Sequence, residues 1–126
     1  MSETWRDPSN IELELIHQLL KQPFQGRDQL REQLIGMKVR NFPNESFSLQ
    51  LKVNNLVPAK TDFRIPVEAY HSDSGDVSDG LGNQVRIYLH VVDEYMNELE
   101  LVKDDGSPIT NFPEPLRLFM FIRPKP

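Results

Sequence analysis

The stretch Gln84–Lys103, QVRIYLHVVDEYMNELELVK, has the most regular apolar alternation in the chain. In its first half the residues of one parity are apolar and those of the other are mostly polar. An alternation of period two is typical of a strand with one buried face. The positions predicted to face the core are Val85, Ile87, Leu89 and Val91.

The second half of the stretch repeats this pattern, with Leu99 and Leu101 predicted to face the core and Glu98 and Glu100 to point away. Asp93 and its neighbour supply turn chemistry, and a connection of about four or five residues is ordinary for a hairpin. The sequence therefore predicts a β-hairpin that the rest of the chain must cover or extend, because two strands alone are marginal in water.

Composition indicates a globular protein of 126 residues, with 38% hydrophobic and 26% charged residues. We expect one domain over 1–126, which includes a loose N-terminal lead-in at 1–8, anchored through Trp5, and a flexible loop at 72–83 rich in Gly, Asp and Ser. The net charge of −5 and the absence of a basic run argue against nucleic acid and anionic membrane as partners.

The chain has no cysteine, which excludes disulfides and thiolate chemistry. No apolar run approaches the roughly 18 residues of a membrane span, and the first residues lack the features of a signal peptide. The expected location is the cytoplasm.

Two helices are predicted before the first strand. Ser9 and Glu12 have capping-box spacing, and Asp28 is expected to cap a second helix that starts near Gly26 and ends at Gly36. Helical spacing predicts that each helix buries one apolar face. These faces are Ile11, Leu15, Ile16, Leu19 and Leu20 in the first helix, and Leu30, Leu34 and Ile35 in the second.

After Gly36 the period changes from helical to alternating. Besides the hairpin, strands are predicted at Met37–Phe42, Ser46–Val53, Ile65–His71 and Leu116–Ile122. The predicted fold class is therefore α+β, with an N-terminal helical hairpin packed on a mainly antiparallel sheet of about five or six strands.

Four segments also form a recognisable set: Phe24–Asp28 with Leu30 and Leu34, Ile65–Ala69, Leu89–Asp93 followed by Glu98–Glu100, and Asp105–Ile109. Together they resemble an uncharacterised family of small bacterial proteins. The likeness extends over roughly residues 11–115 and contains no catalytic fingerprint. It implies a stand-alone domain of unknown function.

A polar cluster is predicted on the outward face of the sheet, if the strands that carry it are neighbours. Its members are Glu68, Tyr70, Arg86, Tyr88, His90, Glu98 and Glu100. One interpretation is a binding surface, and another is a general base at His90 assisted by Glu98 or Glu68. A third is an ordinary solvated sheet face. No residue is assigned a catalytic role.

No metal or cofactor is predicted. Asp73, Asp76 and Asp79 are spaced three residues apart, which differs from the alternate positions of an EF-hand loop. They are read as part of a solvated loop.

The leading functional hypothesis is a non-catalytic module that binds a protein, in particular a basic one, through an acidic sheet face. An immunity-type protein that neutralises a toxin is its most specific form. The alternative is a small enzyme or ligand-binding domain that uses the His/Glu cluster. A homo-oligomer formed through Leu116–Ile122 is a further hypothesis, because this segment is apolar on both parities.

Overall fold

The computed structural model describes residues 4–43, 47–71, 85–103, 106, 109, 112, 113, 115 and 118–122. The predicted flexible loop at 72–83, with Asp73, Asp76 and Asp79, lies outside the described residues.

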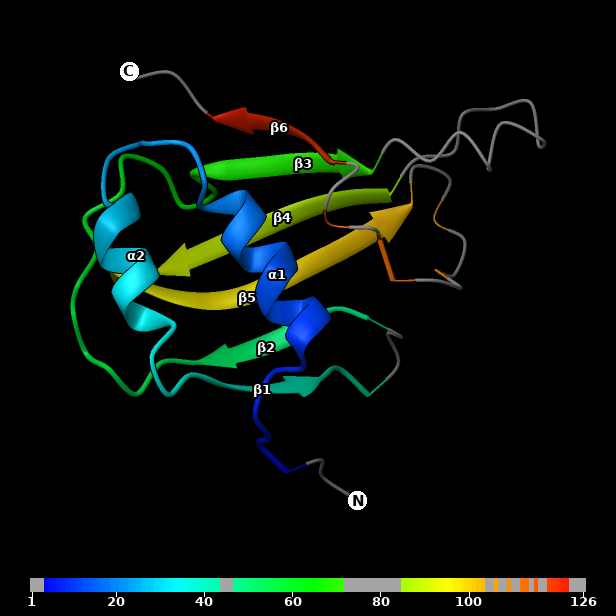
Figure 1. Ribbon diagram of the computed structural model, residues 1–126, viewed down its shortest axis with the longest axis horizontal. Helices are drawn as coiled ribbons and strands as arrows, with labels where there is room; N and C mark the ends of the chain where they lie inside the picture. The colour runs from blue at the N-terminus through cyan, green and yellow to red at the C-terminus, as the bar shows by residue number, and fades with distance from the viewer. Residues whose placement is uncertain are drawn as a thin grey trace.

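Two helices precede a six-stranded sheet, as Figure 1 shows. The elements are α1 (Asn10–Leu19), α2 (Arg27–Gln33), β1 (Lys38–Asn41), β2 (Leu49–Lys52), β3 (Val67–His71), β4 (Val85–Val92), β5 (Tyr95–Lys103) and β6 (Leu118–Ile122). The strand order is β1-β2-β5-β4-β3-β6, and every neighbouring pair is antiparallel. The predicted α+β class is confirmed.

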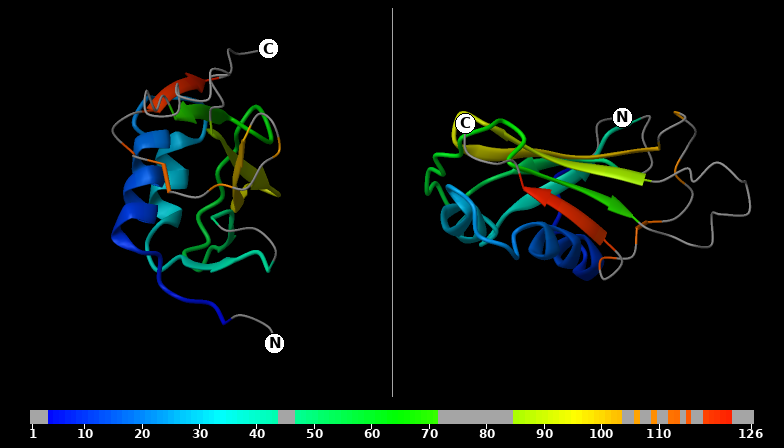
Figure 2. Two further views of the ribbon diagram at one scale, coloured as in Figure 1. Left: turned by 90° about the vertical axis from the view of Figure 1, so that its right-hand side faces the viewer. Right: turned by 90° about the horizontal axis from the view of Figure 1, so that it is seen from above.

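The molecule has two layers, with both helices on the same face of the sheet (Figure 2). The core lies between the layers, and its fully buried members include Leu15, Ile16, Leu30, Ile87 and Leu99. No helix of the described residues covers the other face of the sheet. Within the part of the chain that the structure describes, no helix has the length and apolar character that a membrane span requires.

The predicted start of α1 is confirmed. The backbone N–H of Ser9 donates to Glu12 Oε1 over 2.8 Å, and Ser9 Oγ accepts from the Glu12 N–H over 3.3 Å. The predicted burial of Ile11 is wrong, since this side chain is 43% exposed. The next residue, Glu12, is buried instead, and its carboxylate accepts a hydrogen bond from Arg6 Nη1.

The second helix starts where predicted, but Asp28 does not cap it. Gly26 is the N-cap, with a φ of +90° and no side-chain hydrogen bond. Asp28 Oδ1 instead accepts from Arg27 Nε over 2.8 Å, and Arg27 Nη1 donates to the Leu20 and Lys21 carbonyls at the end of α1. Ile35 is 68% exposed rather than buried, because α2 ends at Gln33 and helical spacing does not continue to residue 35.

The hairpin of β4 and β5 is confirmed, with a tighter turn than expected. Val92 pairs with Tyr95, so only Asp93 and Glu94 form the turn, and both have positive φ values of 50° and 74°. A bulge follows: Val91 stands opposite Met96 and His90 opposite Glu98, which leaves Asn97 without an opposite residue in β4. Met96 and Leu99 are therefore both buried.

Gln33 joins α2 to the sheet. Its Nε2 donates to the carbonyls of Val57 and Glu94 over 2.7 and 2.9 Å, and its Oε1 accepts from the Met96 N–H over 2.9 Å. These bonds connect the helix layer to the β2–β3 connection and to the hairpin turn.

Candidate functional site

The residues of the predicted cluster form one patch on the face of the sheet opposite the helices. Ladder pairing places Glu68 opposite Tyr88, Tyr70 opposite Arg86, Tyr88 opposite Glu100 and His90 opposite Glu98. All of these side chains are half-buried. We call this patch the polar face; it consists of Glu68, Tyr70, Arg86, Tyr88, His90, Glu98 and Glu100.

His90 contacts a carboxylate within the polar face. Its Nε2 lies 2.8 Å from Glu100 Oε1, and the His90 side chain is 16% exposed. Glu98, the direct cross-strand partner of His90, is close as well, whereas Glu68 stands opposite Tyr88 on β3. The carboxylates grouped with the imidazole are therefore those of Glu98 and Glu100.

A second contact fixes the other end of the polar face. Arg86 Nη1 donates to the Tyr70 hydroxyl over 2.8 Å, and the guanidinium carbon lies 4.5 Å from the centre of the Tyr70 ring. Stacking and hydrogen bonding together orient the guanidinium against the Tyr70 side chain.

Basic side chains flank the carboxylates, so this side of the sheet is not uniformly acidic. Arg40 on β1 and Lys52 on β2 lie over the Trp5 ring, with 4.4 and 5.8 Å to its centre. Sequence reasoning expected Trp5 to be anchored but did not group Arg40 and Lys52 with the polar face. That grouping depends on the pairing of β2 with β5, which alternation alone does not reveal.

An open hollow of about 540 Å³ adjoins the polar face next to Glu98. Its described lining residues come from the N-terminal segment, from the position that follows β1, and from β2 and β5. They are Trp5, Phe42, Gln50, Leu51, Lys52, Asn97 and Glu98. A small polar ligand in this hollow would contact both a carboxylate and an ammonium group.

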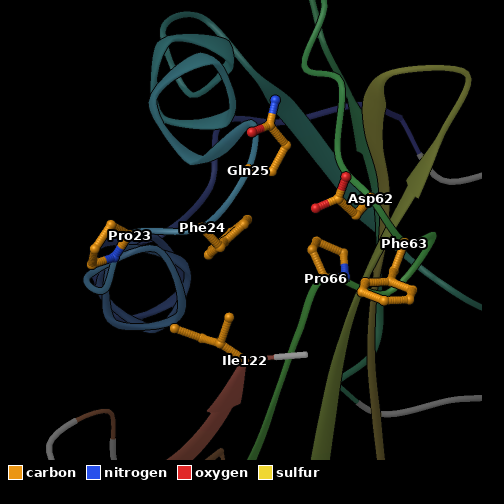
Figure 3. Close-up of a pocket in the computed structure, with 7 residues that line it drawn as sticks. All are labelled: Pro23, Phe24, Gln25, Asp62, Phe63, Pro66 and Ile122. Carbon is orange, nitrogen blue, oxygen red and sulfur yellow. The ribbon is translucent and has the colours of Figure 1, made fainter. Parts of the chain in front are cut away.

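A separate pocket of about 180 Å³ shares none of its described lining residues with the polar face. Figure 3 shows Phe24 and Ile122 on one side of it, and Phe63 and Pro66 on the other, with Asp62 near Gln25. Among the described lining residues, Asp62 is the single ionisable one. This pocket offers room for an apolar group, and the part of its lining that the structure describes holds neither an acid–base pair nor a set of metal ligands.

These features define the class of protein: an α+β domain in which two helices cover one face of an antiparallel sheet and a polar face lies opposite. A family described as a domain of unknown function, DUF6984, matches residues 5–113, and the chain belongs to this family. No curated protein and no solved structure matches the chain. The resemblance to an uncharacterised family is confirmed.

Proposed function

We propose that the protein is a non-catalytic interaction module that binds a protein partner through the polar face. One observation carries this proposal: mixed Tyr, Arg, His and Glu side chains from three adjacent strands form a continuous patch on the side without helices. Tyr and Arg are enriched among residues that dominate binding energy at protein interfaces.

The contacts within the patch support the proposal. Arg86 and Tyr70 are already ordered against each other, so binding through them costs less side-chain entropy. The carboxylates of Glu98 and Glu100 favour a partner with a basic surface and would speed its association. An immunity-type protein that captures a basic toxin is the most specific form of this function.

The test compares capture of partners by two charge-matched variants. Glu98→Lys with Glu100→Lys reverses the charge of the polar face, and Glu14→Lys with Glu32→Lys makes the same change at exposed positions on the helices. A partner held by the wild type and by the helix variant, but lost from the face variant, is the expected result. The purified partner should then bind the wild type at least about tenfold more tightly than the face variant.

Equal binding by both variants would contradict the proposal, provided that circular dichroism shows both to be folded. A third variant, Arg86→Ala with Tyr88→Ala, leaves His90, Glu98 and Glu100 in place. Loss of the partner from this variant is also expected, since the aromatic and guanidinium groups would supply much of the binding energy.

The second candidate is a small enzyme or ligand-binding domain that uses His90 with a neighbouring carboxylate as an acid–base pair. The 2.8 Å contact to Glu100 and the hollow next to Glu98 favour it. An NMR screen with small polar compounds tests it: shifts that cluster at His90 and at the hollow are expected. Compounds that shift no signal there would contradict it.

A further inference from the structure

His90, Glu98 and Glu100 form a group of side chains whose geometry suits a metal ion. One ligand atom from each, a ring nitrogen or a carboxylate oxygen, lies within 4.8 Å of the others. The ladder creates this arrangement, because His90 on β4 stands opposite Glu98, and Glu100 is the next residue of β5 on the same face.

The distances are close to those of a coordination sphere. Transition metals bind imidazole nitrogen and carboxylate oxygen at about 2.0–2.2 Å, which places neighbouring ligand atoms roughly 3.0–3.5 Å apart. His90 Nε2 and Glu100 Oε1, at 2.8 Å, are already near this separation. One carboxylate oxygen of Glu98 lies within 4.8 Å of a ligand atom of each of these two residues.

Charge and burial agree with this geometry. The His90 side chain is 16% and the Glu100 side chain 34% exposed, so two carboxylates are held beside an imidazole that is partly removed from water. A divalent cation would neutralise both carboxylates. A cation bound between His90 Nε2 and Glu100 Oε1 would take the place of their direct contact.

A separate observation concerns the backbone at the same place. The bulge of the β4–β5 ladder lies between His90 and Val91, directly beside the His90–Glu98 pair. Bulges are over-represented next to active sites, where they redirect side chains. Glu98 also lines the open hollow of about 540 Å³, so solvent or a small ligand can reach a cation bound there.

We propose that His90, Glu98 and Glu100 bind one divalent first-row transition metal ion, such as Zn²⁺, with solvent at the remaining positions. The imidazole nitrogen favours this class over Mg²⁺ and Ca²⁺, which prefer all-oxygen ligands. Three protein ligands leave a position open, as in catalytic rather than structural zinc sites. The proposal goes beyond the interaction function and does not depend on a partner.

The test is calorimetric titration of the chelator-treated protein with Zn²⁺ alone, and with Mg²⁺ in parallel. One equivalent of Zn²⁺ should bind with a dissociation constant in the range of about 10 µM or below, and Mg²⁺ should not compete. His90→Ala, Glu98→Gln and Glu100→Gln should each weaken Zn²⁺ binding by about tenfold or more.

The controls are Glu68→Gln, on the same face but outside the group, and His17→Ala, an exposed histidine of α1. Both should bind Zn²⁺ as the wild type does. Circular dichroism identifies any variant that fails to fold. If His90→Ala fails to fold, the near-isosteric Glu98→Gln and Glu100→Gln variants still allow the comparison.

Two outcomes would overturn the site: no stoichiometric Zn²⁺ binding below about 100 µM, or glutamine variants with wild-type affinity, which means adventitious binding only. Either outcome leaves the proposed interaction function standing, because that function is tested separately with the Arg86 and Tyr88 variant. Conversely, a variant that loses the partner but still binds Zn²⁺ would show that the metal site does not depend on the interaction function.

Discussion

Gln33 shows how much a single buried polar residue contributes to this fold. It is fully buried, and its amide makes three hydrogen bonds to the backbone at Val57, Glu94 and Met96. Helical periodicity gave this residue no role, because polar residues are expected to be exposed. The signal that could have found it is its place one turn after Leu30, at a position where an apolar residue would continue the buried face.

We predict that Gln33→Met lowers the free energy of unfolding by about 2–3 kcal/mol. Methionine has a similar length and leaves little cavity, so the main cost is the loss of partners for buried backbone groups, above all the Met96 N–H. Urea denaturation measures the change. The matched control is Gln29→Met, at an exposed position of α2, which should shift stability by less than about 0.5 kcal/mol. Equal effects in the two variants would contradict this account.

Glu12 has the clearest electrostatic effect of any residue described. Burial raises the pKa of its carboxyl. Hydrogen bonds from Arg6 and from the Ser9 backbone, together with the charge of Arg6, lower the pKa by more than burial raises it, so the pKa lies below its usual value. Arg6 Nη1 and Nη2 contact the two carboxylate oxygens at 2.8 and 2.9 Å. A carboxyl with a depressed pKa stabilises the fold above its unfolded pKa of about 4.3, and this contribution is lost as pH falls through the folded value.

We predict that Arg6→Met destabilises the fold by about 1–2 kcal/mol at pH 7, less than for a fully buried pair, because the Arg6 side chain is 40% exposed. The difference from wild type should shrink as the pH falls from the unfolded pKa of about 4.3 through the lowered pKa of Glu12 in the folded protein. Denaturant unfolding at pH 7 and pH 3 measures it. Lys38→Met, which removes the exposed pair with Asp7, should change stability by less than about 0.5 kcal/mol at pH 7. A difference for Arg6→Met that did not vary with pH would exclude the Glu12 carboxylate as its cause.

At the scale of elements, the β4–β5 turn uses residues that are poorly suited to its backbone. Asp93 and Glu94 both adopt positive φ, the conformation for which type I′ turns prefer Asn-Gly. A left-handed residue with a Cβ costs roughly 1–2 kcal/mol.

We therefore predict that Glu94→Gly stabilises the protein by about 0.5–1 kcal/mol. The Glu94 carbonyl, which accepts from Gln33 Nε2 and from the Ala59 N–H, remains in place. Thermal unfolding measures the gain. Glu94→Ala keeps the Cβ and should give no such gain, so stabilisation of both variants alike would point to charge rather than backbone strain.

The same hairpin shows what alternation could and could not predict about the fold. Burial of Val85, Ile87 and Leu89 followed from parity, and the structure agrees. The short turn was missed, because neither of its residues is the glycine or asparagine that normally marks it. The bulge was missed as well, since one inserted residue, Asn97, leaves each half of the strand with a regular pattern.

For the candidate site, too, alternation predicted the face on which each residue lies but not the contacts between strands. Parity assigned Tyr88, His90 and Glu100 to one face, which the structure bears out. The contact of His90 with Glu100 was not predictable, because it depends on the register that the bulge sets. Arg40 also remained outside the predicted site, since the order of strands beyond a hairpin depends on packing of the whole chain.

At the scale of the whole molecule, the two edges of the sheet differ. At the β1 edge, Arg6 pairs with Val39 through two backbone hydrogen bonds of 2.8 and 2.9 Å. The opposite edge is β6, which pairs with β3 on one side, and no strand among the described residues pairs with its other side. The sequence of β6, LFMFI, contains neither the charges nor the proline that usually protect an edge strand.

We predict that β6 mediates self-association through edge-to-edge pairing of two copies, which would extend the sheet across a two-fold axis. Sedimentation velocity should show a dimer that dissociates on dilution. Phe119→Lys with Phe121→Lys should weaken the dimer by about tenfold or more, because charges on an edge strand oppose its pairing. Ile35→Lys, which places a charge at an exposed apolar position outside the sheet, is the control and should leave the dimer intact. A monomer at every concentration would show that the edge is protected by other means, and dissociation by Ile35→Lys would move the contact to the helix layer.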